Sequence, residues 1–347
     1  MLAGYPSYSV AAVNGHPNFN KLPTIDDMGR KHKRMQYNPN LDGLRAVAIL
    51  LVVAVHAKAP LFPGGFIGVD LFFVLSGYLI TTTLNENKEL RRFYLDRFWR
   101  LVPALSLMLS SYLIIFPFIF PDYNHARDAA VAFFYLADYS SAYTSIPNYI
   151  THTWSLAVEE HFYMLWPIIM LRFNPTARAI FILFVIASIH RALWIDVHEA
   201  YRKFDTRLSG LLLGCFIAKA KPTDAFPAWP GILVLILAAA EFESGQKWVQ
   251  RWGFTIVEFA SAVAILGRPQ KWLSNRFLVY IGKISYGLYL WHYPIVRITR
   301  DNGFPWEINL SFSLTLGLLC ASASYHWIES PIKRWRTKDY QIRATHT

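Results

Sequence analysis

Residues 66–84 read FIGVDLFFVLSGYLITTTL, and Asp70 is the only charged side chain in that stretch. A helix of about 20 apolar residues crosses the hydrocarbon core of a bilayer, so this stretch predicts a membrane span. A carboxylate inside such a span is costly and is a functional candidate. The glycines around Asp70 favour close helix packing as a simpler role for the motif. Ser76 lacks a G-x-S-x-G context, so a nucleophilic serine is not expected here.

The composition of the 347-residue chain is unusually apolar. Hydrophobic residues make up 54% of it and charged residues only 16%, and the mean hydropathy is +0.26. Ordinary soluble domains carry about a quarter charged residues. The excess apolar surface must therefore face lipid, which sets aside a soluble enzyme or a secreted domain.

The basic balance of the chain has a membrane explanation. The formal net charge is +11, but most Lys and Arg lie in short clusters between apolar runs. Such clusters fix the orientation of membrane proteins, so a nucleic-acid partner is not expected. The two cysteines, Cys215 and Cys320, lie inside apolar runs. They form neither a disulfide framework nor a zinc spacing, and no metal site is predicted.

The fold class predicted from these runs is an all-α, polytopic bundle of about ten membrane helices. The weakest candidate is 230–241, which is short, and 122–150 could contain a re-entrant or interfacial helix. The expected spans are 41–57, 66–84, 101–120, 154–171, 178–194, 206–220, 230–241, 252–267, 279–298 and 308–328.

Loop charges predict the orientation. Basic clusters at 30–34, 88–100 and 333–338 fall on one side together with smaller ones, whereas the opposite loops are poorer in Lys and Arg. The richer side is the cytosol, so both termini are expected there, in a multi-pass protein of the cell membrane. No internal repeat is visible, which argues against an inverted-repeat transporter.

Three regions are expected along the chain. Residues 1–37 are polar, and no apolar h-region follows Met1, so we expect a mobile cytosolic tail rather than a cleaved signal peptide. Residues 38–336 form the membrane domain, and residues 337–347 form a second cytosolic tail.

The first span carries two candidate functional residues. Arg45 and His56 are eleven residues apart, about three helical turns and roughly 16 Å, so both lie on nearly the same helix face. The alternative is a snorkelling arginine and an interfacial histidine, which the nearby Lys58 keeps open.

Arg97 and Arg100 form a second candidate group. They are one turn apart, and two guanidinium groups on one face suit a diphosphate. Taken alone, the pair is better explained as a positive-inside anchor beside interfacial aromatic residues.

Two adjacent carboxylates, Glu159 and Glu160, enter the apolar run 154–171. They lie about 100° apart around a helix, so at most one faces a given cavity. A functional role is favoured, because a carboxylate in hydrocarbon can orient an imidazole or act as a base.

Together these segments resemble the acyltransferase-3 family of integral-membrane O-acyltransferases. The resemblance covers residues 38–336 in the family's order and departs from it at His161, where the family often has Gln. The motifs that carry it are Leu41–Arg45 through His56, Gly64–Gly77, Arg97 with Arg100, Trp154–Pro167, Thr206–Gly210 (TRLSG), Ser285–His292 (SYGLYLWH) and Ile328–Pro331 (IESP).

The resemblance implies transfer of an acyl group, usually acetyl from cytosolic acetyl-CoA, to a hydroxyl of a glycan, a glycolipid or a secondary metabolite. Acetyl-CoA would be a co-substrate, with no permanently bound cofactor, and membrane lipid would surround the protein. A proton-coupled transporter or exporter is the alternative function, and a structural or partner-binding membrane protein is a further alternative.

Residue roles are expected on the same basis. His56 is expected to be the general base, with Glu160 either orienting it or sharing its proton. Asp70 is a further catalytic candidate. Arg45, Arg97 and Arg100 are expected to bind the donor. Other candidates are Glu159, Tyr163, Arg207, His292 and Glu329.

Overall fold

The computed structural model describes residues 37–86, 89–221 and 226–336. In these ranges the regular structure is helical, apart from one isolated β-bridge between Pro227 and Arg268. The predicted all-α class is confirmed. The two predicted tails, 1–37 and 337–347, lie outside the described residues except for Tyr37.

Ten longer helices occur in the described ranges, and each predicted span overlaps one of them. They are α2 (Pro39–His56), α3 (Gly68–Glu86), α4 (Leu90–Ile119), α7 (Thr153–Phe173), α8 (Ala177–Leu193), α10 (Phe204–Ala220), α11 (Trp229–Glu241), α12 (Phe254–Leu266), α14 (Ser285–Asp301) and α15 (Trp306–Ser324). The shorter elements are η1 (Gly65–Ile67), α5 (His125–Phe133), α6 (Ala137–Thr144), α9 (Val197–Arg202), η2 (Val249–Gly253), α13 (Arg276–Lys283) and η3 (Tyr325–Glu329).

Within the described residues, five helical segments are long and apolar enough to cross a membrane, judged by length and composition. They are Pro39–His56, Gly65–Glu86, Leu90–Ile119, Val249–Leu266 and Trp306–Arg336, and Trp229–Glu241 is a shorter apolar helix. The count of about ten spans and their orientation therefore stay predictions.

Two predicted segments differ in detail. The run 279–298 is divided at Ile284 into α13 and α14. Helix α13 packs against the start of α2, where a Cβ on Gly282 would lie 1.9 Å from the Asp42 carbonyl oxygen. The uncertain stretch 122–150 contains two short helices, α5 and α6, instead of one span.

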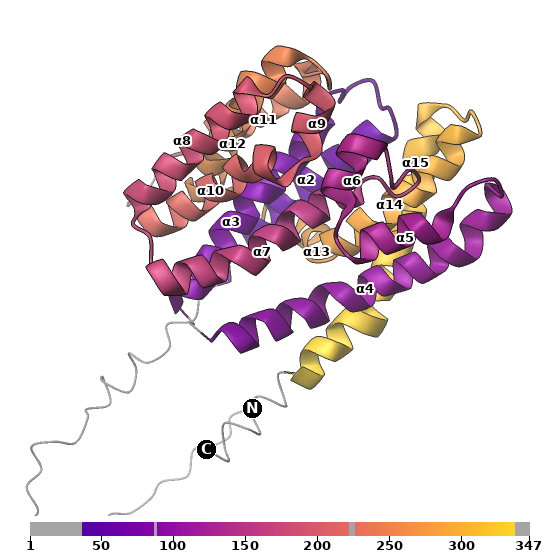
Figure 1. Cartoon of the computed structure of the whole chain (residues 1–347), viewed down its shortest axis with the longest axis horizontal. Helices are drawn as coiled ribbons and strands as arrows, with labels where there is room; N and C mark the ends of the chain where they lie inside the picture. Colours follow the sequence, from indigo (N-terminus) through magenta and orange to yellow (C-terminus); the bar gives the residue numbers. More distant parts are fainter. Residues whose placement is uncertain (1–36, 87–88, 222–225, 337–347) are drawn as a thin grey trace, which may run out of the picture. The chain divides into compact units, whose positions relative to one another are not determined.

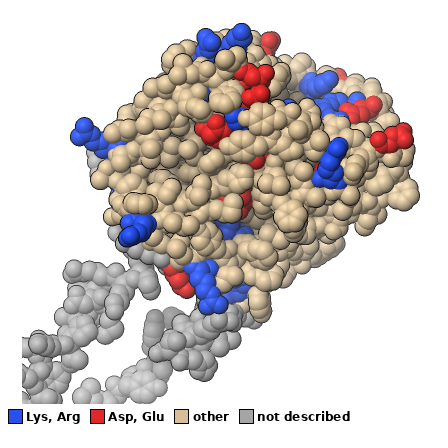
Figure 2. All heavy atoms as spheres, viewed as in Figure 1, with Lys and Arg blue, Asp and Glu red and all other residues tan. Residues whose placement is uncertain are grey.

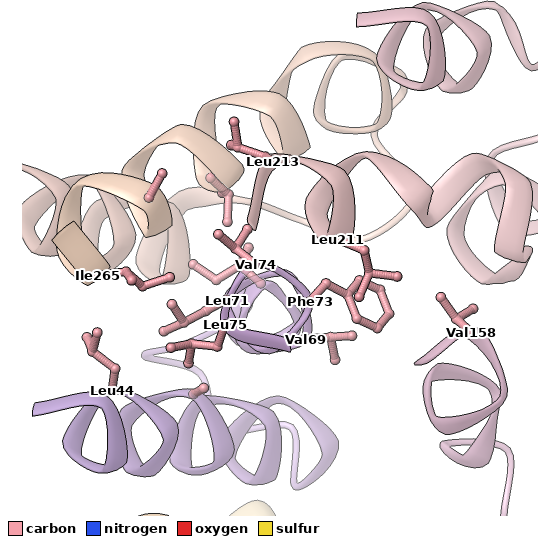
Figure 3. Close-up of a cluster of buried hydrophobic side chains, with 14 of the residues drawn as sticks. Leu44, Val69, Leu71, Phe73, Val74, Leu75, Val158, Leu211, Leu213 and Ile265 are labelled. Atoms are coloured by element: carbon pink, nitrogen blue, oxygen red, sulfur yellow. The ribbon is translucent and has the colours of Figure 1, made fainter. Parts of the chain in front are cut away.

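Helix α3 lies at the centre of the largest core (Figure 3). Its apolar side chains meet α2 at Leu44, α10 at Leu211 and Leu213, α12 at Ile265 and α7 at Val158. In Figure 1, α8, α10, α11 and α12 gather on one side of α3, while α4, α5, α14 and α15 gather on the other. The helix that decides the fold is thus enclosed by protein.

The outer faces of other helices are apolar. Ile114 and Phe118 on α4 and Ile186 and Ile189 on α8 are exposed. Most of the face in Figure 2 is uncharged. Such surfaces suit contact with lipid tails rather than water.

Candidate active site

Helix α2 carries Arg45 near its start and His56 at its end. The helix begins at Pro39, whose fixed φ suits the first turn, and the Asn38 side chain caps it by accepting from the Asn40 N–H at 3.0 Å. The two candidate residues therefore belong to opposite ends of one buried helix.

His56 pairs with a second histidine from α14. Its Nδ1 lies 2.9 Å from His292 Nε2, and the two rings stack at 5.1 Å between centroids. The ring of Tyr293 meets His56 edge-on at 4.8 Å, and Arg300 donates to the His56 carbonyl oxygen at 3.4 Å. The predicted candidates His56 and His292 are thus in direct contact.

A third histidine, His152, completes a histidine cluster (His56, His152 and His292). Its ring lies 5.6 Å from that of His292 and stacks on Tyr293 at 4.7 Å. It is 1% exposed, and neither ring nitrogen has a hydrogen-bond partner within the described part of the chain. His152 was not among the residues predicted from the sequence. The available signal was its position just before an apolar run, at the same predicted side of the membrane as His56.

Arg97 is held by both carboxylates of α7. Its Nε donates to Glu160 Oε1 at 3.1 Å, and a terminal nitrogen lies 3.9 Å from Glu159 Oε2. Its guanidinium carbon lies 3.1 Å from the centroid of the Tyr163 ring. Glu159 in turn accepts from the Ser76 hydroxyl at 2.8 Å. Three of the predicted candidates, Glu159, Glu160 and Tyr163, therefore contact one guanidinium, and Ser76 holds one of the two carboxylates.

Arg45 has a local acidic neighbour. Its guanidinium lies 3.6 Å from Asp42, which also accepts from the Tyr37 hydroxyl at 2.7 Å. Burial and the hydrogen bond to Asp42 raise the pKa of Tyr37 to about 12. Tyr37 therefore stays a proton donor to this carboxylate at neutral pH.

Arg100 differs from the other two arginines. It lies within electrostatic reach of Arg45, Arg97 and Glu329, so the three cations form an arginine cluster. Among the described residues, no hydrogen bond or ion pair holds the exposed Arg100 side chain. Glu329 is itself bonded to the Ser324 hydroxyl at 3.2 Å. Arg100 is thus the member of the cluster with the most free hydrogen-bonding capacity.

Asp70 pairs with Arg207 at the centre of the bundle. The two side chains are 2.7 Å apart and each is 1% exposed. The Arg207 guanidinium also lies 4.0 Å from the Phe254 ring centroid. Neither residue contacts the histidine cluster in the ranges that the structure covers. This geometry is that of an ion pair joining α3 to α10. Asp70 therefore does not contact the proposed base, His56, and a catalytic role for it stays a prediction.

A second buried ion pair was not singled out from the sequence. Arg191 on α8 lies 2.7 Å from Glu258 on α12, and Glu258 also accepts from the Ser209 hydroxyl at 2.6 Å. Both charges lie inside predicted spans, which was the signal that could have revealed them.

The expected contact between Glu160 and His56 is absent. Glu160 is bound to Arg97, whereas the ring partner of His56 is His292. The carboxylate was expected to orient the imidazole because both lie inside apolar runs, but sequence alone does not place the two helix faces together. A catalytic part for Glu160 stays a prediction.

Comparison with known families shows which protein family the chain belongs to. The profile of the acyltransferase-3 family, described as an acyltransferase domain, matches residues 38–326. The chain belongs to this family. The resemblance drawn from the motifs is therefore confirmed, and an acyltransferase domain is favoured over a transporter.

Curated relatives are named as O-acetyltransferases. The chain is 32% identical to peptidoglycan O-acetyltransferase OatA of Listeria monocytogenes over 353 residues, covering 86% of this chain and 56% of the relative. It is 35% identical to O-acetyltransferase OatA of Staphylococcus aureus, with 86% and 58% covered. It is 31% identical to the putative peptidoglycan O-acetyltransferase YrhL of Bacillus subtilis, with 91% and 58% covered. The chain thus spans a little more than half the length of these relatives.

No solved structure matches the chain.

Proposed function

We propose that this chain is a membrane O-acetyltransferase that transfers an acetyl group from acetyl-CoA to a hydroxyl of a cell-wall glycan. Two curated relatives carry peptidoglycan O-acetylation in their names, which favours peptidoglycan as the acceptor. Because the chain spans just over half of their length, its substrates are part of the proposal.

The observation that carries the proposal is the pair of clusters on α2. Arg45 belongs to the arginine cluster and His56 to the histidine cluster, roughly 16 Å apart along the helix. Guanidinium groups suit the phosphates of CoA. The thioester arm of the same molecule would then extend along α2 toward the imidazole.

The chemistry proposed for His56 is general-base catalysis. Its ring takes the proton of the acceptor hydroxyl as the oxygen attacks the thioester carbonyl. The new C–O bond forms and the C–S bond breaks, which gives an acetate ester and CoA thiolate. The imidazolium returns its proton to the thiolate, so CoA leaves as the free thiol and His56 is neutral again.

The proposed topology matches this direction of transfer. With about ten spans and both termini in the cytosol, the arginine cluster lies at the cytosolic ends of its helices. His56 and His152 then lie toward the outside, where a cell-wall glycan is found. The proposed location is the cell membrane.

The test uses the full chain in lipid nanodiscs with radiolabelled acetyl-CoA. Peptidoglycan fragments should gain label while free CoA thiol appears in equal amount. His56→Gln should lower turnover by about 10²–10⁴-fold, because the amide cannot take the proton. The control is His125→Gln. His125 is also buried, but it is hydrogen-bonded to Tyr112 and is not part of the histidine cluster, so this variant should leave turnover unchanged.

Three results would count against the proposal. Label that never reaches glycan fragments removes the glycan acceptor. No release of thiol removes the CoA donor. Turnover that survives in His56→Gln places the base elsewhere.

A further inference from the structure

The hydrogen bond between His56 and His292 has a direction that the neighbouring backbone sets. His292 Nδ1 lies 3.1 Å from the Leu288 carbonyl oxygen. A carbonyl oxygen only accepts, so this nitrogen must carry a hydrogen. In a neutral imidazole the other nitrogen, Nε2, then holds a lone pair.

The surroundings keep both rings neutral. His292 is fully buried, and in the described ranges no carboxylate contacts either ring. The guanidinium of Arg300 lies close to the His56 carbonyl. Asp301 pairs with Arg300 at 3.8 Å and with Arg297 at 2.7 Å. A buried imidazolium with no carboxylate in contact with it would be costly. The neutral form of His292 therefore accepts at Nε2, and His56 donates from Nδ1.

This direction fixes the tautomer of His56. With the hydrogen on Nδ1, the lone pair of His56 is on Nε2. We propose that His292 is a positioning residue that holds His56 in this tautomer, so that Nε2 is the atom that takes the acceptor proton. The inference rests on the proposed role of His56 as general base.

The fold holds His292 in place for this task. The Ser313 hydroxyl of α15 donates to its carbonyl oxygen at 3.1 Å. A Cβ on Gly317 would lie 3.7 Å from the His292 Cα, so α15 packs closely behind it. The edge of the Tyr293 ring against His56 limits rotation of the base. Once His56 takes a proton, its charged Nδ1–H makes a stronger bond to His292.

The direct test reads the tautomer itself. Nitrogen NMR of the full chain, labelled with ¹⁵N-histidine and placed in nanodiscs, distinguishes a protonated from an unprotonated ring nitrogen. The signal that disappears in His56→Gln is the signal of His56. We expect His56 to carry its hydrogen on Nδ1. A hydrogen on Nε2 in the unmodified protein overturns the inference, whatever the activity.

Variants at His292 test the cause. Leu offers no acceptor, so His292→Leu should move the His56 hydrogen to Nε2. It should also lower kcat by about 10²-fold, with KM for acetyl-CoA unchanged. In His292→Gln the amide oxygen can accept from Nδ1–H, so both the tautomer and most of kcat should return. His125→Gln, the matched buried histidine, should change neither.

The outcomes separate this inference from the proposed function. A His56 tautomer unchanged in His292→Leu shows that His292 does not set it. His292→Gln as inactive as His292→Leu shows that His292 must ionise, which also overturns the inference. Turnover that survives in His56→Gln instead removes the base assignment of the proposed function. The spectrum of the unmodified protein decides the tautomer even if the leucine variant fails to fold.

Discussion

At the scale of single residues, the three arginines of the cluster are not equivalent. Arg97 is neutralised by Glu159 and Glu160, and Arg45 lies beside Asp42. Arg100 keeps its hydrogen-bonding capacity. The sequence alone treated Arg97 and Arg100 alike, because their i, i+3 spacing says nothing about which one meets the carboxylates of α7.

Donor affinity should therefore depend most on Arg100. Arg100→Ala should weaken binding of acetyl-CoA about 10- to 100-fold, because one charge-assisted hydrogen bond to a phosphate contributes about 1.5–3 kcal/mol. Arg100→Lys should recover part of this loss, since an ammonium cannot bind bidentately. Calorimetric titration of the full chain with CoA measures the change.

A matched control is Arg91, an exposed cation on the same helix. Arg91→Ala should leave the affinity for CoA unchanged. Equal losses in Arg91→Ala and Arg100→Ala would mean that the helix attracts the donor only by its overall charge.

At the scale of helices, glycines set the distance between α3 and α10. A Cβ on Gly77 would lie 1.9 Å from the Leu211 carbonyl oxygen, and one on Gly214 would lie 2.1 Å from that of Val74. The motif glycines near Asp70 were predicted to allow close packing, and this pair of contacts confirms that role for Gly77.

Gly77→Ala should force the two helices apart. Overpacking of a tight interface costs about 1–3 kcal/mol, so the thermal midpoint in detergent should fall. Thr83→Ala, at an exposed position on α3, is the control and should leave the midpoint almost unchanged. A stable Gly77→Ala variant would show that the interface can relax.

The ion pair between Asp70 and Arg207 makes a second prediction about these helices. Arg207→Met leaves a buried carboxylate without its partner, which costs about 3–5 kcal/mol. The double variant Asp70→Leu with Arg207→Met removes both charges and should recover most of the thermal midpoint. Thermal unfolding of the single and double variants tests this, and an equally unstable double variant would point to a role beyond pairing.

The positions of most helices could be predicted from the sequence, but their partners could not. Each predicted span overlaps a long helix because apolar runs of this length favour helices in lipid. The sequence predicted one helix over 279–298 and missed the break at Ile284, because the apolar run continues from α13 into α14 without a visible interruption. The contacts of His56, Glu160 and Arg191 were missed because they depend on how helices face one another across the bundle.

At the scale of the whole molecule, the predicted topology can be read with reporter fusions. Reporter fusions after Arg100 and after Lys338 should both report the cytosol, and a fusion after Lys58 should report the outside. Loop charges are the physical reason. A fusion after Arg100 that reports the outside would place the arginine cluster away from cytosolic acetyl-CoA, and the proposed direction of transfer would fail with it.

The two buried ion pairs also have a consequence for synthesis. Arg207 leaves the ribosome 137 residues after Asp70, which at about 5–20 residues per second is a delay of roughly 7–27 s. Glu258 follows Arg191 after 67 residues. During each interval one charged helix has been made while its partner has not. With the predicted spans, the insertion machinery would have to shelter each charge until its partner helix is made, and a nascent chain that stalls in between would leave a lone charge facing lipid.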